Sequence, residues 1–191
     1  MPNWCDTTYK CVGDRKQVQE LHRAIQSIER RKTPLIENGF GKLWLGCLVS
    51  KLGFDWNDYR CRGEITDYYL EGDVLTIYQS TAWCEQEGVR ECIEKKFPGI
   101  KVYYLEEEPG MCLYMTNDRN GDYFTERYLI DSYDGPEYYD TLEDVAKEVS
   151  ELTGKEVKAD RKEIVEALEQ HQRLQDEDSF YYFHEIEVVE S

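Results

Sequence analysis

Cysteine and histidine are the side chains here that could form a nucleophilic or zinc site, and their spacing predicts neither. The chain has seven cysteines and three histidines, and no two cysteines form a Cys-x-x-Cys pair. A structural zinc site needs four ligands, usually supplied as close pairs. We therefore expect reduced thiols that are buried as small apolar residues. Of His22, His171 and His184, only His184 is a conceivable neighbour of a buried cysteine.

One segment has the residue types of a metal loop. Asp118-Arg119-Asn120-Gly121-Asp122 resembles the start of a calcium loop, in which oxygen ligands at alternate positions converge on the ion. Tyr123 then stands where the loop's glycine belongs, and Leu129 where its bidentate glutamate belongs. Asx-rich turns are common between strands for backbone reasons alone. We favour a hairpin loop, and metal binding by Asp118, Asn120 and Asp122 stays open as the alternative.

The remaining motifs predict no catalytic residue. Gly39-Phe40-Gly41 lacks the lysine and the strand-to-helix context of a phosphate-binding loop. With 40 carboxylates in the chain, a pair such as Glu64 and Asp67 carries almost no information. We predict no catalytic site, no cofactor and no metal, and we lean against an enzyme.

Tryptophan is the other chemically distinctive residue type. The chain starts Met1-Pro2-Asn3-Trp4-Cys5, and such residues at a terminus indicate that something ties it down. We therefore expect Trp4 to be buried in the first strand. Trp4 and Trp83 both lie at the edges of predicted elements, where their indoles would cap the core. The alternative is a binding surface, because tryptophan is a frequent interface anchor.

Charge is distributed unevenly along the chain. The net charge is −17, and residues 111–191 alone carry 8 basic and 22 acidic side chains, or −14. Such a surface repels nucleic acid and anionic membranes. No apolar run approaches the ~18 residues needed to cross a bilayer, and no leader peptide is recognisable. We expect a cytoplasmic protein without membrane or nucleic-acid partners, and the sequence sets no oligomeric state.

The elements that must position these residues follow an α+β order. Residues 3–12 alternate as a strand, and Asp14 is the expected N-cap of a helix that runs to about residue 31. A short helix over 42–52 lies in an insertion at about 33–60. The clearest unit is a hairpin of 62–70 and 74–80, followed by a helix over 84–97 and a strand over 100–105. This β-α-β-β-α-β order predicts a ferredoxin-like antiparallel sheet covered on one face by two helices.

The rest of the chain is expected to extend that core. A turn is expected at 106–110, then strands at 111–117 and 123–130, helices at 140–153 and 159–174, and a last strand at 180–189, after Asp176-Glu177-Asp178. We predict a single body over residues 1–191, with a core over 1–131 and an acidic α-α-β extension over 132–191.

The start of the chain, the hairpin leading into Thr81-Ala82-Trp83, and Glu108-Pro109-Gly110-Met111 resemble the YubB-like family. These are uncharacterised proteins of phages and plasmids that carry a ferredoxin-like domain. The match covers about residues 1–130. It departs from the family at Thr7, where asparagine is usual, and at Cys84-Glu85, near which proline often follows the second tryptophan. The resemblance implies a fold and a mobile-element origin, and no activity.

Taken together, these patterns favour a non-enzymatic protein-binding module associated with a mobile element, working through its tyrosine-rich sheet and its acidic extension. Two alternatives remain. One is a small metal-dependent protein or enzyme centred on residues 117–131. The other is an acidic mimic of DNA that inhibits a host DNA-handling protein, although lysines and arginines interrupt the acidic array.

Overall fold

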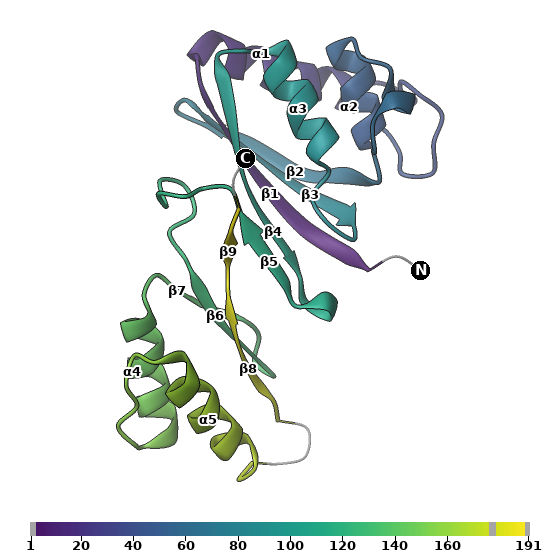
Figure 1. Cartoon of the computed structure of the whole chain (residues 1–191). Helices are drawn as coiled ribbons and strands as arrows, with labels where there is room; N and C mark the ends of the chain where they lie inside the picture. The colour runs from purple at the N-terminus through teal and green to yellow at the C-terminus, as the bar shows by residue number, and fades with distance from the viewer. Residues whose placement is uncertain (1–2, 176–178, 190–191) are drawn as a thin grey trace. The chain divides into compact units, whose positions relative to one another are not determined.

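The computed structural model describes residues 3–175 and 179–189, so Met1, Pro2 and the segment 176–178 of the sequence argument lie outside the described residues. The chain is an α+β protein with multi-stranded sheets and, among the described residues, five α-helices (Figure 1). This confirms the predicted class. Its contacts divide it into two compact units, the first ending at Asp118 and the second beginning at Arg119.

The first unit is built on an antiparallel sheet. Its strands follow the order β2-β3-β1-β4-β5, and each is antiparallel to its neighbour. The central strand β1 places Tyr9 opposite Ile77 of β3 and Tyr104 of β4. The strands are β1 (Trp4–Gly13), β2 (Gly63–Glu71), β3 (Val74–Ala82), β4 (Ile100–Glu108) and β5 (Leu113–Thr116).

Three helices cover one face of this sheet (Figure 1). They are α1 (Arg15–Glu29), α2 (Leu45–Leu52) and α3 (Glu87–Lys96). The side chain of Asp14 accepts the hydrogen bond of Gln17 N, so it is the N-cap that the sequence predicts. Gly53 ends α2 at φ +98°, a left-handed conformation that glycine adopts without strain. Short 3₁₀ turns, η1 (Trp56–Asp58) and η2 (Pro109–Met111), complete the unit.

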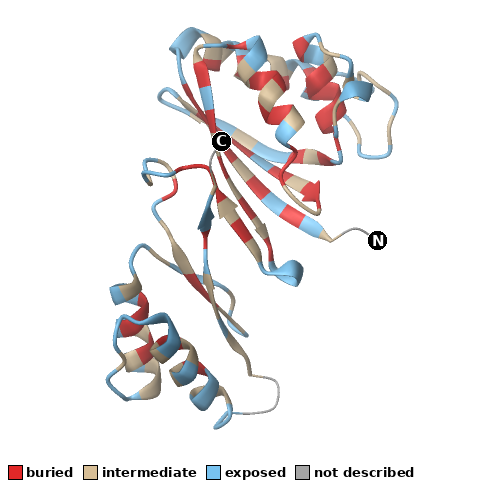
Figure 2. Cartoon of the chain, in the orientation of Figure 1, coloured by how far each residue is buried: buried red, intermediate tan, exposed pale blue. Residues whose placement is uncertain are grey.

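The prediction that Trp4 is buried is wrong. Side chains alternate along β1, so that Cys5, Thr7 and Tyr9 point under the helices and are buried (Figure 2). Trp4 belongs to the other face and is 48% exposed. The start of β1 is held by the buried side chain of Cys5 and by the pairing of β1 with β3. Neither interaction requires the Trp4 indole to be buried.

The second unit packs two helices on a small antiparallel sheet of order β7-β6-β8. Its core joins Ile130 of β6 to Val149 of α4 and Leu168 of α5, among others. The elements are β6 (Tyr128–Ser132), β7 (Glu137–Tyr139), α4 (Leu142–Thr153), α5 (Arg161–Gln172) and β8 (Tyr181–Glu185), followed by β9 (Glu187–Val188).

Several boundaries differ from those expected. Strand β4 continues to Glu108, through the residues predicted to turn, because its alternation of buried and half-buried side chains persists to that residue. The strand expected at 123–130 starts only at Tyr128, and β7 was not predicted. The division between the units falls after Asp118 rather than at 131. That the whole chain behaves as a single body stays a prediction.

None of the helices in the described parts of the chain has both the length and the apolar character needed to cross a membrane.

Candidate functional site

The two tryptophans of the binding-surface hypothesis lie at the same end of the first unit's sheet. Trp4 begins β1 opposite Ala82, and the backbone N–H of the next residue, Trp83, donates to the carbonyl of Asn3 at 2.9 Å. The indole of Trp4 meets the ring of Phe40 edge to face, with centroids 6.2 Å apart. Trp4 and Phe40, which is 38% exposed, form what we call the aromatic patch.

Trp83 is strained. Its backbone φ is +76°, in a region of conformations that bulky residues rarely adopt. Among the described residues other than glycine, Cys112 is the one further residue with a positive φ. The strain falls directly after the end of β3 at Ala82, and α3 starts at Glu87 rather than at the expected residue 84. Such strain persists only where surrounding contacts hold it, and it is often found at functional sites.

A buried hydrogen-bonded network holds the segment after Trp83. The hydroxyl of Tyr9 donates to the carboxylate of Glu85, which also pairs with Arg90 at 3.1 Å. The backbone N–H of Glu85 donates to the carboxylate of Glu106 on β4. Tyr9, Glu85, Arg90 and Glu106 are each at most 8% exposed. We call these four residues the buried network.

The buried network shifts the protonation of its members. Burial raises the pKa of the Glu85 carboxyl above its ordinary value, although Arg90 and Tyr9 oppose the rise. Burial likewise raises the pKa of Glu106, against the hydrogen bond from the Glu85 backbone. Burial, with the negative charge of Glu85, raises the pKa of Tyr9 well above its ordinary range. Both carboxyl groups therefore lose their protons at a higher pH than exposed glutamates do.

Cys5 lies beside this network and is chemically quiet. Its Sγ is 4.0 Å from a Glu106 oxygen and 3.7 Å from the Thr7 hydroxyl. Burial, and secondarily Glu106, raises the pKa of the thiol to about 11. Because the thiolate is the nucleophile, a cysteine held protonated at neutral pH is a poor one. The arrangement positions a loop; it does not activate a nucleophile.

Two further buried polar side chains lie on the same side of the sheet. Gln79 is 3% exposed and Glu108 is 4% exposed. Among the described residues, both amide atoms of Gln79 and the Oε2 of Glu108 have no hydrogen-bond partner. Gln79 is cross-strand neighbour to Thr7, which in turn faces Glu106. This end of the helix-covered face is therefore polar.

The other tryptophans and the free thiols are structural. Trp44 is buried, donates its indole N–H to the Cys61 carbonyl at 2.6 Å and packs on Trp56. All seven cysteines are free, and the expectation of burial is confirmed for five of them. It is wrong for Cys112, which is exposed, while Cys84 is half-buried.

The histidines do not form a nucleophilic pair with a cysteine inside either unit. His22 on α1 meets the ring of Tyr68 at 5.7 Å, and burial lowers its pKa. His184 belongs to β8 of the second unit, whereas every cysteine precedes residue 119. Burial also lowers the pKa of His184, so its neutral form prevails at physiological pH.

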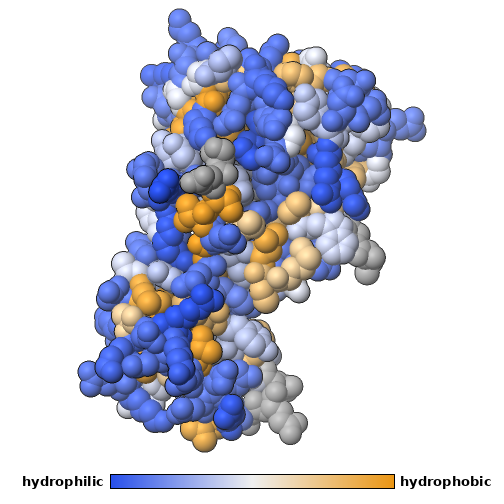
Figure 3. All heavy atoms as spheres, viewed as in Figure 1, coloured by the Kyte–Doolittle hydropathy of each residue, from blue (hydrophilic) through white to orange (hydrophobic). Residues whose placement is uncertain are grey.

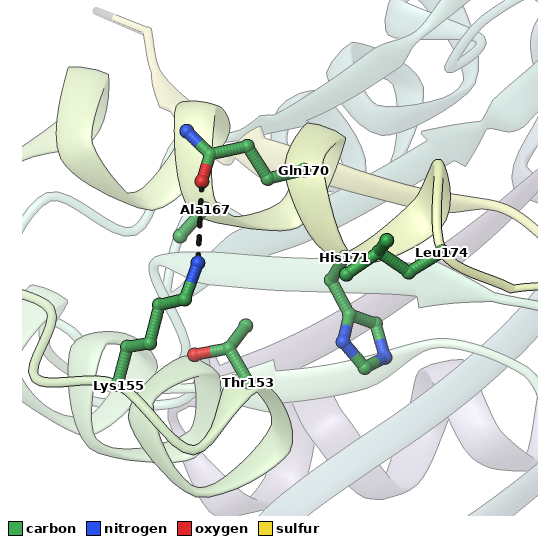
Figure 4. Close-up of a pocket in the computed structure, with 6 residues that line it drawn as sticks. All are labelled: Thr153, Lys155, Ala167, Gln170, His171 and Leu174. Carbon is green, nitrogen blue, oxygen red and sulfur yellow. Dashed lines mark hydrogen bonds between the residues drawn. The ribbon is translucent and has the colours of Figure 1, made fainter.

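His171 lines a small pocket in the second unit, between the end of α4 and α5 (Figure 4). Its volume is about 60 Å³, which accommodates a few water molecules. The amine of Lys155 donates to the side chain of Gln170 across it, at 3.5 Å. The lining residues are Thr153, Lys155, Ala167, Gln170, His171 and Leu174.

In the loop that resembles a calcium site, the structure places two of the three candidate side chains in contact with each other. The Asp118 side chain is fully buried, and its backbone N–H donates to the Thr116 hydroxyl at 3.1 Å. Asn120 turns its amide to Asp122, at 3.4 Å. Within residues 3–175 and 179–189, no three His, Cys, Asp or Glu side chains are grouped so that they could hold a metal ion.

Figure 3 shows that the surface in view is mostly hydrophilic, with apolar side chains gathered in small patches. Comparisons of the chain with models of known protein families, with curated proteins and with solved structures found no match. The sequence did not predict the buried network, nor the contact of Trp4 with Phe40, which lies between Gly39 and Gly41. Alternation along β1 was the available signal for the exposure of Trp4; nothing local marked Glu85 or Glu106.

Proposed function

We propose that this chain is a non-enzymatic protein-interaction module of mobile-element origin, and that its first unit is a ferredoxin-like domain of the YubB-like kind. The order β2-β3-β1-β4 with antiparallel neighbours, and the helices α1 and α3 on one face, support the ferredoxin-like assignment. The motifs at Trp4, Trp83 and Glu108 support the family.

The observation that carries the interaction role is the exposed aromatic patch. Tryptophan is among the residues that dominate binding energy at interfaces, and burying a whole indole is strongly favourable. Trp4 is 48% exposed although it stands in a regular strand. The strained Trp83 and the buried network beneath it fix the end of the sheet on which the patch lies. A rigid aromatic anchor loses little conformational entropy on binding.

The interaction role can be tested by photo-crosslinking. A benzophenone amino acid at position 40 places the reactive group in the patch, and the same group at the 76% exposed Tyr133 is the matched control. In a lysate of the organism that encodes the chain, we expect one protein to crosslink at position 40 and not at position 133. Trp4→Ala should abolish that crosslinked product. Identical products at both positions, or none at position 40, would contradict the proposal.

A further inference from the structure

A group of hydroxyl side chains and one amine lies on the helix-free face of the first unit's sheet. Tyr69 of β2 is paired with Thr76 of β3, and Thr76 is paired on its other side with Lys10 of β1. Directly paired residues point to the same face of a sheet. Tyr9 points under the helices, so its neighbour Lys10, with Thr76 and Tyr69, belongs to the opposite face.

These side chains are in direct contact with one another. The amine of Lys10 donates to the hydroxyl of Thr76 at 3.1 Å and lies 5.9 Å from the centroid of the Tyr69 ring. The ring of Tyr78, two residues after Thr76 on β3, lies 6.2 Å from the Tyr69 ring, centroid to centroid. We call Lys10, Tyr69, Thr76 and Tyr78 the phenol cluster.

The phenol cluster favours the ionised form of Tyr69. Hydrogen bonding from Thr76 and from Tyr78, together with the positive charge of Lys10, lowers the pKa of Tyr69 below its ordinary value of 10.0. The negative charge of Glu71, on the same strand, opposes this shift without reversing it. The pKa of Tyr78 is raised, chiefly because of its hydrogen bond with Tyr69. Tyr69 is therefore the acceptor of the cluster, and its donors stabilise the phenolate.

Other tyrosines of the chain are shifted in the opposite direction. Burial, and then a neighbouring glutamate, raises the pKa of Tyr9, Tyr68, Tyr104 and Tyr139. In a chain with a net charge of −17, carboxylates generally oppose the ionisation of a phenol. The donors and the amine of the phenol cluster reverse that tendency at Tyr69.

The Tyr69 side chain is open to solvent while its donors are held by the sheet. Tyr69 is 40% and Tyr78 37% exposed, whereas Thr76 is 1% exposed. Pairing of β2 with β3 fixes Tyr69 opposite Thr76, on an edge strand of the sheet. A protonated tyrosine is a weak nucleophile, and a lowered pKa activates it. Tyr69 combines this activation with access from solvent.

We propose that Tyr69 is a covalent-modification site, whose phenolate oxygen attacks an activated acyl or sulfonyl group while Lys10, Thr76 and Tyr78 hold that oxygen ionised. With a sulfonyl fluoride, the new O–S bond forms as the S–F bond breaks, fluoride leaves, and the phenol proton passes to the solvent. With an acyl imidazole, the new O–C bond forms as the C–N bond breaks, and imidazole leaves. This inference goes beyond the proposed function and does not depend on it.

Competitive labelling of the full chain tests this. The folded protein is treated at neutral pH with a limiting amount of benzenesulfonyl fluoride or of N-acetylimidazole, and peptide mass spectrometry follows the labelling rate of each tyrosine. We expect Tyr69 to react at least about threefold faster than Tyr133 with either reagent, although Tyr133 is 76% exposed. Exposure alone would give the reverse order.

Variants of the phenol cluster test the cause of the reactivity. Lys10→Met removes the positive charge, and Thr76→Val removes a donor while keeping the shape of the side chain. Each should slow the labelling of Tyr69 about threefold or more and leave the other tyrosines unchanged. Lys101→Met is the matched control, because the Lys101 amine also lies 5.9 Å from a tyrosine ring centroid, that of Tyr103. It should change the Tyr69 rate by less than about twofold.

Labelling of Tyr69 no faster than that of Tyr133 in the wild type would overturn the inference, and this comparison needs no variant to fold. Equal slowing by Lys10→Met and Lys101→Met would also overturn it, because the cause would then be the overall charge. The position-40 crosslink is a separate result: its loss would contradict the proposed function and leave the reactivity of Tyr69 standing.

Discussion

The two faces of the first unit's sheet use polar residues in opposite ways. On the helix-covered face, Glu106 accepts a backbone hydrogen bond and Glu85 is paired with Arg90, all of them buried. On the helix-free face, the carboxylates of Asp6 and Glu64 flank Ser80, and the rings of Trp4 and Tyr78 are exposed. Buried partners make the first set structural, whereas the exposed aromatic rings of the second face are suited to binding a partner. Substitutions on the two faces should therefore separate stability from binding.

The largest effect is expected from Arg90→Ala, which leaves the Glu85 carboxylate buried without its cation. We expect a loss of about 3–5 kcal/mol in the free energy of unfolding at pH 7. Urea denaturation followed by tryptophan fluorescence measures it, because all four tryptophans belong to the first unit. Glu87→Gln is the matched control: it removes the other carboxylate near Arg90, which is 72% exposed, and should cost less than about 0.5 kcal/mol. A loss below 1 kcal/mol for Arg90→Ala would show that the network does not hold the fold.

The buried carboxylates also predict how stability depends on pH. The folded pKa values of Glu85 and Glu106 lie above the ordinary value of 4.5, so the unfolded chain ionises first as the pH rises. Their contribution is fully present below pH 4.5 and is lost as the pH rises through the folded pKa values. The urea midpoint should increase as the pH falls from 8 towards 5, and Glu106→Gln should flatten this slope. A slope unchanged in Glu106→Gln would contradict the assignment.

A smaller effect is expected from Thr7→Val on the same face. The hydroxyl of Thr7 is 3.0 Å from that of Thr81, and both are buried. Thr81 also donates to the Cys5 carbonyl at 3.3 Å, so it keeps one partner. We expect a loss of about 1 kcal/mol in unfolding free energy, measured by urea denaturation. Thr8→Val, at the next position but half-buried on the other face, should change stability by less than about 0.5 kcal/mol.

Much of the first unit could be predicted because its signals are local. Asp14 and Gly53 mark helix ends, and the turn before Val74 marks the hairpin. The position of Trp4 could not be obtained from the general behaviour of chain ends. Alternation along the strand decides it, because a buried Cys5 places its neighbour Trp4 on the opposite face of the sheet.

The buried network could not be predicted because it joins residues far apart in sequence. Tyr9 and Glu85 are 76 residues apart, and Glu85 and Glu106 are 21 apart. In a chain with 40 carboxylates, no spacing distinguishes these two from exposed ones. The strand register that brings β1 beside both β3 and β4 creates the network.

The most direct test of the interaction role is the affinity of the protein captured at position 40 for the wild type and for Trp4→Ala, measured by titration calorimetry. We predict that Trp4→Ala lowers the affinity at least about tenfold and changes the free energy of unfolding by less than about 1 kcal/mol. Tyr133→Ala, which removes a more exposed ring from the second unit, should bind as the wild type does. Wild-type affinity in a correctly folded Trp4→Ala protein would contradict the account.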